Sequence, residues 1–373
     1  MSNNLLTALH SKHLALNAKM APFAGFEMPL QYSTVKEEVA AVRTNIGMFD
    51  VGHMGEFEIT GNEAYNFVEY LLPNDFINAG SDKAIYSPLC RENGTIIDDL
   101  IAYKLGPNRV LLCVNASNIE KDWEWISNQA KKFDCTITNC SDQYSLIAIQ
   151  GPKSESILNR LDVVPTGEHP FEHYSVRTIE QDGNELIIAR TGYTGEEGVE
   201  LFGTHHNIST LWDQLLEQGV TPCGLVARDV LRLEAGFPLY GNELSDLLTP
   251  LDTGLKWTVR PDKNDFLGKK ALCSDNSELP KYRQIRLLLE QGVPRAGYPV
   301  LNSQNEEVGK VTSGTLSPTL GKGIALASIL NEKFSIAESY SVQIRNRTQP
   351  ATRYKKPFIT GDYKLWNTKL PKS

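Results

Sequence analysis

The chain changes character near residues 275–280, and this change constrains the fold more than any other feature of the sequence. Before it, helical and strand-like patterns are mixed without the regular alternation that a doubly wound sheet requires. After it, short strand-like runs follow one another, separated by glycine and proline. Single cores stop growing near ~250–300 residues, so 373 residues indicate more than one domain. We therefore expect an α+β region over residues 1–275 and a small all-β domain over residues 276–373.

Individual elements can be expected from hydrophobic periodicity and from turn residues. Helical patterns cover residues 34–45, 62–72, 118–133, 208–217 and the Arg-rich stretch 223–236. Strand patterns cover residues 95–103, 109–114, 146–149, 184–190 and 199–202, and, in the C-terminal part, 284–289, 308–312, 323–327 and 341–344. The stretches 184–190 and 199–202 flank a glycine-rich turn and are expected to pair.

Composition excludes several classes of protein. The net charge of −8 argues against nucleic-acid binding by the chain as a whole. No stretch of ~20 apolar residues occurs, so we expect no transmembrane helix and no membrane partner. The six cysteines form no C-x-x-C pair, which predicts reduced thiols and a cytoplasmic protein. We expect no metal site, because the histidines lack a ligand spacing and only His53 has a suggestive setting.

The C-terminal end differs from the rest of the chain in charge. From Ser341 onward it carries eight cations and one anion, whereas the whole chain is acidic. Such a basic segment can be a solvated tail, or it can meet a polyanionic ligand or an acidic partner. The sequence leaves both interpretations open.

Two adjacent aspartates lie within the strand expected over residues 95–103. Because side chains alternate along a strand, Asp98 and Asp99 point to opposite faces. Asp99 shares its face with Ile97, Ile101 and Tyr103, where a carboxylate must be satisfied or its pKa raised. The pair can serve as a cap for neighbouring amides at a strand end, or one carboxylate can be functional.

The glycine-rich turn 191–198 is not a dinucleotide fingerprint, because its spacing differs and a strand follows instead of a helix. Three glycines near Tyr193 suit a close approach of the backbone to a flat ligand. Glu200 lies in the next strand, on the face opposite Val199 and Leu201. A buried carboxylate there needs a donor, either an internal arginine or a ligand with adjacent N–H groups.

The expected helix 223–236 places Arg228 and Arg232 four residues apart on one face. These arginines, with Asp229, can form a surface ion-pair network. Alternatively, an arginine here can bind a carboxylate of a ligand, which is the usual role of a guanidinium.

Together, several segments resemble the T-protein family of the glycine cleavage system. The matching stretches, in chain order, are KMAPFAGFEMPL (19–30), VRTNIGMFDVGHM (42–54), IIDDL (96–100), IQGP (149–152), TGYTGE (191–196), ARDVLRLEAG (227–236) and VTSGTLSPTLG (311–321). Seven stretches in this order, spread from residue 19 to residue 321, make a specific signal. One departure is Gly52, where family members commonly have serine.

The resemblance implies a fold and a reaction. The fold is a multidomain ring that holds folate in a central channel. Residues 1–275 would form a folate-binding catalytic region of two interleaved α+β subdomains, ferredoxin-like or mixed α+β, and residues 276–373 a C-terminal β-barrel domain. The family takes the aminomethyl group carried on the reduced lipoyl arm of H-protein and transfers its carbon to tetrahydrofolate. The transfer releases ammonia and forms 5,10-methylenetetrahydrofolate, so H-protein and tetrahydrofolate are the expected partner and co-substrate, without a metal.

The resemblance also implies roles for residues. The essential carboxylate falls on Asp99, close to the reacting folate nitrogens, where it would orient the nucleophile and stabilise cationic character on the transferred carbon. Glu200 would bind the aminopyrimidine edge of the pterin. The remaining folate contacts fall on Met54, Tyr86, Tyr103, Val114, Asn115, Tyr193, Arg228, Trp257, Arg295 and Tyr363.

Two other functions fit parts of the pattern. A folate-dependent demethylase on the same scaffold is one, whereas the related flavin-containing dehydrogenases need a further domain for which 373 residues leave no room. A folate-binding protein of iron–sulfur cluster maintenance is the other. Those proteins carry a lysine-glycine-cysteine signature near the glycine-rich turn, where this chain has no cysteine.

Overall fold

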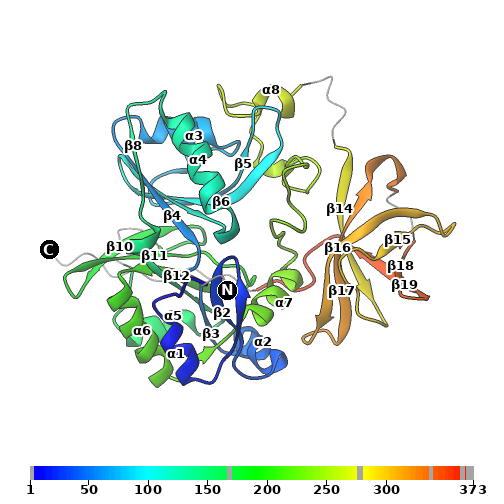
Figure 1. The fold of residues 1–373 in the computed structure, drawn as a ribbon, viewed down its shortest axis with the longest axis horizontal. Coiled ribbons are helices and arrows are strands. Elements are labelled where there is room, and N and C mark those ends of the chain that lie inside the picture. The colour runs from blue at the N-terminus through cyan, green and yellow to red at the C-terminus, as the bar shows by residue number, and fades with distance from the viewer. Residues whose placement is uncertain (1–3, 166–169, 275–279, 336–338, 362–365, 367–373) are drawn as a thin grey trace.

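The computed structural model describes residues 4–165, 170–274, 280–335, 339–361 and 366. Two sheets of mostly antiparallel strands, together with their helices, form one half of the molecule, and a closed barrel forms the other (Figure 1). Helix α7 (Leu225–Ala235) lies between the two halves. The expected α+β fold with a C-terminal β-barrel is confirmed. The expected boundary between residues 275 and 276 lies outside the described residues.

The first sheet has five antiparallel strands, with β6 next to β7 near its centre. Two helices pack their apolar sides against one face, through Phe67 and Val68 of α3 and Ile126 of α4. The other face turns toward the second sheet. The elements are β5 (Ala84–Cys90), β6 (Ile96–Gly106), β7 (Arg109–Val114), β4 (Gly55–Thr60), β8 (Thr136–Asn139), α3 (Ala64–Leu71) and α4 (Ile119–Ala130).

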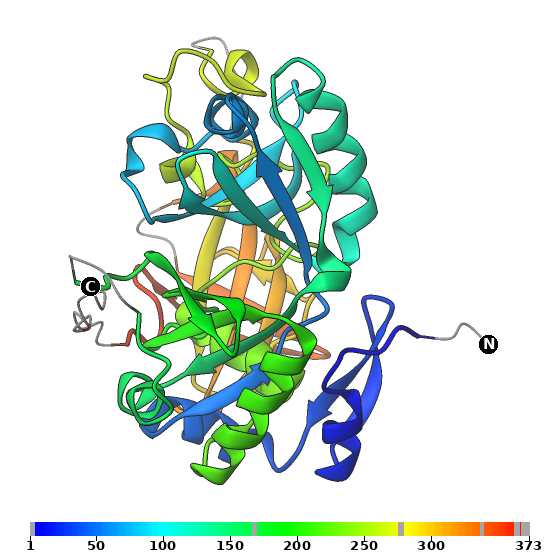
Figure 2. The same cartoon turned by 90° about the vertical axis from the view of Figure 1, so that its left-hand side faces the viewer.

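The second sheet has six strands and helices on both faces. Helices α1, α5 and α6 cover one face around Trp212, whereas α2 and α7 share a core on the other face with Tyr103 of the first sheet. The two sheets are therefore joined by a common apolar core, and Figure 2 shows the first sheet above the second. The elements are β10 (Val176–Gln181), β11 (Asn184–Ala189), β12 (Gly198–Gly203), β9 (Ser145–Gln150), β3 (Gly47–Asp50), β13 (Thr221–Pro222), α1 (His10–Ala15), α2 (Val35–Thr44), α5 (Ser154–Arg160) and α6 (His205–Glu217). A hairpin of β1 (Lys19–Phe23) and β2 (Phe26–Gln31) lies between α1 and α2 in the chain.

The C-terminal barrel closes because β14 pairs with both β17 and β19. Its interior is filled by alternating apolar side chains such as Leu287, Val311 and Ile329. The strands, in order around the barrel, are β14 (Tyr282–Leu289), β17 (Lys322–Leu330), β16 (Glu307–Ser317), β15 (Pro299–Leu301), β18 (Tyr340–Ile344) and β19 (Arg347–Tyr354). A short helix, α8 (Lys269–Leu272), precedes the barrel.

Local chemistry explains why the helices begin and end where they do. Thr34 and Glu37 form a reciprocal capping box at the start of α2. Helix α7 ends at Gly236, whose φ of 74° is a left-handed conformation that glycine adopts at little cost. Helix α6 begins earlier than periodicity predicts: Thr204 accepts a hydrogen bond from Asn207 N, so His205 and His206 start the helix and do not lie on a strand. Among the described residues, no helix has the length and apolarity needed to cross a membrane.

Candidate active site

A cavity of about 750 Å³ lies where the two sheets, α7 and the barrel meet. This volume is in the range of small-molecule sites in proteins. Its walls come from β6 and β7 of the first sheet, β12 of the second sheet, α7, the loop 237–257 and barrel strands β14 and β17. Segments far apart in the sequence therefore contribute to one cavity.

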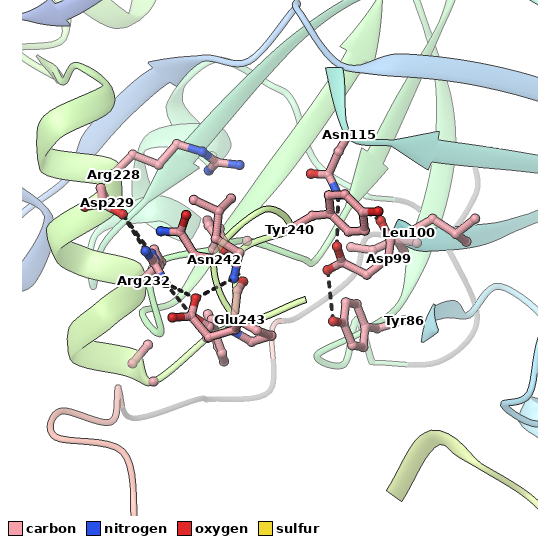
Figure 3. A pocket seen from close by; sticks show the side chains of 18 of the residues that line it. Tyr86, Asp99, Leu100, Asn115, Arg228, Asp229, Arg232, Tyr240, Asn242 and Glu243 are labelled. Carbon is pink, nitrogen blue, oxygen red and sulfur yellow. Dashed lines mark hydrogen bonds and ion pairs between the residues drawn. The ribbon is translucent and has the colours of Figure 1, made fainter. Parts of the chain in front are cut away.

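Asp99 faces this cavity from β6, together with Ile101 and Tyr103. The Tyr86 hydroxyl donates to Asp99 Oδ2 at 2.9 Å, and Asn115 Nδ2 donates to Oδ1 at 2.9 Å (Figure 3). Burial and the charge of neighbouring Asp98 raise the pKa of Asp99 to about 7. A carboxyl with this pKa exists in both protonation states near neutral pH, which suits acid–base or electrostatic work on a ligand.

Asp98 lies on the opposite face of β6 and is fully buried. It accepts hydrogen bonds from Asn115 N at 3.1 Å, Asn115 Nδ2 at 2.8 Å and Asn118 Nδ2 at 2.7 Å. The two alternatives for the aspartate pair, a cap for neighbouring amides and a functional carboxylate, thus apply to different residues. Asp98 binds neighbouring amides, and Asp99 lines the cavity.

Glu200 contributes a second carboxylate to the cavity wall, from β12. Its Oε2 accepts from Thr191 Oγ1 at 2.5 Å and from the Tyr103 hydroxyl at 3.5 Å. Hydroxyl groups of the protein therefore provide donors for this buried carboxylate, and neither bond uses Oε1. A ligand with adjacent N–H groups can complete the set of hydrogen-bond donors to the Glu200 carboxylate.

The glycines of the turn 191–198 are explained by packing within the protein. A Cβ at Gly192 or Gly198 would collide with the side chain of Gln150, and Gly195 has a φ of +74°. Gln150 itself is held by Thr194, whose Oγ1 donates to Gln150 Oε1 at 2.7 Å. Packing against Gln150 therefore accounts for Gly192, which also lines the cavity, and packing against Gln150 and the Ile149 carbonyl oxygen accounts for Gly198.

The arginines of α7 differ in their surroundings, although both line the cavity. Arg232 is fully buried and contacts Glu243 at 2.9 Å, Asp229 at 2.8 Å and Ser313 of the barrel at 2.8 Å. The expected ion-pair network is therefore centred on Arg232, and Arg232 is buried instead of lying at the surface. Arg228 has a buried Nη1 that no described residue hydrogen-bonds, and a ligand can satisfy it.

Aromatic rings add flat surfaces to the cavity. Tyr86 stacks on Trp257 with ring centres 6.0 Å apart and ring planes 22° apart. Tyr193 stacks on Phe237 at 5.9 Å and 18°, and the Arg228 guanidinium lies 4.9 Å from the Tyr193 ring. Trp257 keeps 58% of its surface exposed, so its ring remains accessible.

Most of the residues expected at the site meet at this cavity. The lining includes Met54, Tyr86, Asp99, Tyr103, Asn115, Tyr193, Glu200, Arg228 and Trp257. Val114 does not line it: alternation along β7 turns Cys113 to the cavity and Val114 into the core under α3 and α4. Arg295 is exposed on the barrel and donates to Gly314 O at 3.3 Å, away from the lining. Tyr363 lies outside the described residues.

Several lining residues were not expected from the sequence. Tyr240, Asn242 and Glu243 reach the cavity from the loop 237–257; Figure 3 shows Asn242 and Glu243 on the side of α7 and the Tyr240 ring beside Asp99. This loop has no periodic pattern, so alternation could not place its side chains. His53 also lines the cavity; its Nδ1 has no hydrogen-bond partner in the described part of the chain, and burial lowers its pKa to about 4, so the ring is neutral. The sequence signal that could have placed His53 at the site is the stretch FDVGHMGE (49–56) in which it lies.

The described part of the chain contains no group of three or more His, Cys, Asp and Glu side chains that could hold a metal ion. All six cysteines are free thiols. The groups that line the cavity include carboxylates, guanidinium groups, the neutral imidazole of His53, the thiol of Cys113 and aromatic rings.

Comparison with known proteins gives consistent matches over nearly the whole chain. Residues 9–263 match the GCVT N-terminal domain, and residues 283–359 match the glycine cleavage T-protein C-terminal barrel domain. The aminomethyltransferase of Staphylococcus epidermidis is 43% identical over 352 residues, which cover 94% of this chain and 97% of that protein. The aminomethyltransferase of Pseudothermotoga lettingae is 45% identical over 366 residues, covering 96% and 99%. The crystal structure of glycine cleavage system aminomethyltransferase T from Bartonella henselae superposes with a TM-score of 0.90 at 30% identity, covering 97% of this chain and 99% of that one.

Proposed function

Because this chain belongs to the glycine cleavage T-protein family and is an aminomethyltransferase of the glycine cleavage system, we propose that its cavity is where one-carbon transfer to tetrahydrofolate takes place. The donor is the aminomethyl group on the reduced lipoyl arm of H-protein. The products are ammonia, the dihydrolipoyl arm and 5,10-methylenetetrahydrofolate. The six free thiols suit the reducing cytoplasm as the compartment of this reaction.

Tetrahydrofolate fits the polar groups that the cavity leaves available. The Glu200 carboxylate suits the adjacent N–H donors of an aminopyrimidine edge, because its protein donors occupy only Oε2. The unpartnered Arg228 Nη1 suits an acceptor oxygen of the same ligand. The stacked pair of Tyr86 and Trp257 offers a flat apolar surface for an aromatic ring.

Asp99 is the residue that acts on the reacting carbon in this proposal. Tyr86 and Asn115 hold one carboxylate oxygen each, so the group has a fixed orientation. When ionised, it lies close to positive charge that develops on the transferred carbon as the bond to sulfur breaks. A preorganised charge in a buried site stabilises such a transition state more than water does. The single observation that carries the proposal is this oriented carboxyl, with a pKa of about 7, on the cavity wall.

Asp99→Asn tests this assignment. Asparagine keeps the shape and the hydrogen bond from Tyr86 but loses the charge, so we expect turnover to fall roughly 10²–10⁴-fold with little change in the Kd for tetrahydrofolate. Turnover is measured as ammonia released from lipoylated, aminomethyl-loaded H-protein, and Kd by calorimetry.

The matched control is Asp142→Asn, which changes an exposed aspartate distant from the cavity lining. Unchanged turnover in Asp99→Asn would make Asp99 a structural residue. Absence of ammonia release from the unmodified enzyme, with retained folate binding, would instead favour a folate-dependent demethylase.

A further inference from the structure

Behind Asp99, on the side of β6 that faces away from the cavity, two more carboxyl groups meet. Asp98 comes from β6 and Asp122 from α4, and both have 0% exposed surface. Neither residue lines the cavity. A fully buried carboxylate is costly unless its charge is satisfied, so the protonation state of this pair needs a physical explanation.

The two carboxyls have very different partners. Asp98 accepts three hydrogen bonds from N–H groups of Asn115 and Asn118, at distances of 2.7–3.1 Å. Among the described residues, no N–H or hydroxyl donor reaches either oxygen of Asp122, and its side chain hydrogen-bonds with the carboxyl of Asp98. Two ionised carboxylates cannot hydrogen-bond to each other, because neither has a donor. One of them must therefore carry a proton, and the donors around Asp98 select Asp98 as the anion.

Burial raises the pKa of both carboxyls, and the hydrogen bonds from Asn115 and Asn118 oppose that rise at Asp98. Burial, together with the negative charge of Asp98, raises the pKa of Asp122 to about 11. Asp122 is therefore a neutral acid over the working range of the enzyme. The charged or titratable groups that interact with the three aspartates from neighbouring elements are Lys121, Tyr86, Cys113, Tyr193 and Tyr240. Lys121 alone among them is a cation, and it opposes the rise in the pKa of Asp122 without cancelling it.

One amide connects this buried pair to the cavity. Asn115 Nδ2 lies 2.8 Å from Asp98 Oδ1 and 2.9 Å from Asp99 Oδ1, so it bridges the two aspartates. The same nitrogen lies 3.1 Å from the Asp99 carbonyl oxygen. The charge of Asp98 also raises the pKa of Asp99. A change in the protonation of Asp98 would therefore alter both the position of Asn115 and the ionisation of Asp99.

We propose that Asp122 is a positioning residue that stays protonated, donates its proton to Asp98, keeps Asp98 ionised, and through Asn115 orients the Asp99 carboxylate. The inference rests on the proposed role of Asp99 in catalysis. Asp122 touches neither the cavity nor a ligand, so its effect is transmitted through Asp98 and Asn115.

Three variants separate this role from a merely structural one. In Asp122→Asn, the side-chain amide replaces the acid as donor to Asp98, and we expect kcat within about 2-fold of wild type with an unchanged acid limb of the pH profile. In Asp122→Leu, Asp98 loses the donor from Asp122 and keeps those from Asn115 and Asn118, and we expect it to take up a proton because the remaining site is apolar and buried. The acid limb should then move to lower pH by roughly 1 unit or more, because the charge beside Asp99 is gone. We expect kcat to fall roughly 10–100-fold as Asn115 shifts, with the Kd for tetrahydrofolate unchanged.

Asp98→Asn removes the charge directly and should shift the acid limb in the same direction, which keeps the test decisive if Asp122→Leu does not fold. Infrared difference spectra provide a readout that is independent of turnover. Wild type minus Asp122→Asn should show the carbonyl band of a protonated aspartic acid at pH 8.

Absence of that band, or equal damage in Asp122→Asn and Asp122→Leu, would overturn the proposal, because either result means that Asp122 is ionised or that its donor function is irrelevant. If the band is present but turnover does not depend on Asp99, the protonation of Asp122 is supported and the proposed function of Asp99 is refuted. The two failures are therefore distinguishable.

Discussion

Glu200→Gln is the perturbation that most directly tests how the cavity binds its ligand. The Thr191 hydroxyl donates to Glu200 Oε2 at 2.5 Å and can donate equally well to the amide oxygen of glutamine, so the local structure should persist. The substitution replaces a charged acceptor by a neutral amide whose NH₂ group cannot accept from the ligand. The effect should therefore fall on ligand binding.

The magnitude follows from the strength of a hydrogen bond to a charged group. Such bonds contribute about 1.5–3 kcal/mol in proteins. Because 1.4 kcal/mol corresponds to a tenfold change in Kd, the Kd for tetrahydrofolate should rise roughly 10–150-fold. At saturating folate the value of kcat should stay within a few-fold of wild type, since Asp99 and its partners Tyr86 and Asn115 are unchanged.

Calorimetry gives the Kd, and ammonia release from loaded H-protein gives kcat and KM. The matched control is Glu180→Gln, which makes the same chemical change at an exposed position on β10 of the same sheet. A Kd equal to that of wild type would refute the assignment of Glu200 to folate recognition. A fall in kcat at unchanged Kd would place Glu200 in the chemical step instead.

Two further predictions concern acidity and stability. Burial and Asp98 raise the pKa of Asp99 to about 7, and its ionised form is the active one, so kcat/KM should fall about tenfold per pH unit below pH 7 and level off above it. Ammonia release measured across this pH range checks the prediction. A flat profile down to about pH 5 would contradict it. Lys263→Met should lower the free energy of unfolding by about 2–4 kcal/mol, because Lys263 Nζ donates to the carbonyls of Glu69, Leu72 and Asn74 at 2.6–2.7 Å at the end of α3. Urea denaturation measures this loss of stability. Stability equal to that of wild type would show that water replaces these hydrogen bonds.

The part of the site that could be predicted is the part built on regular strands. Alternation along β6 places Asp99 with Ile101 and Tyr103, and the structure has these three side chains on the cavity wall. The same rule applied to β7 would have placed Cys113, and not Val114, at the cavity. The resemblance named Val114 because a family motif locates a stretch of chain and does not specify which way each side chain points.

The rest could not be predicted, because it depends on contacts between segments that are distant in sequence. Gly192 is required by the side chain of Gln150 and Gly198 by the carbonyl oxygen of Ile149; both groups come from β9, and nothing near the turn indicates this. Tyr240 and Glu243 lie in a loop without hydrophobic periodicity. In the barrel, β15 is only three residues long and β19 contains Pro350, so both strands are weak signals in the sequence, although β19 is needed for closure.

The cavity depends on the position of the barrel, and buried polar contacts fix that position. The apolar contact between α7 and the barrel is small, centred on Leu233 and Leu326. Apolar contacts of this kind have little directional preference. Two charged side chains of α7 add direction: Arg232 donates to Ser313 at 2.8 Å, and Glu234 accepts from the Ser317 hydroxyl.

Both serines belong to β16, so α7 is held to one barrel strand at two points. At one of these points the bond to Ser313 comes from Arg232, which also lines the cavity. Glu234 also binds Arg43 of α2 at 2.8 Å, which extends the connection to the second sheet. A buried charge that loses its partner costs about 3–5 kcal/mol, so displacement of the barrel along this contact is strongly disfavoured. Helix α7 thus has two roles that arise from the same surface. It presents Arg228 to the cavity, and it sets the distance between the cavity wall and the barrel that completes it.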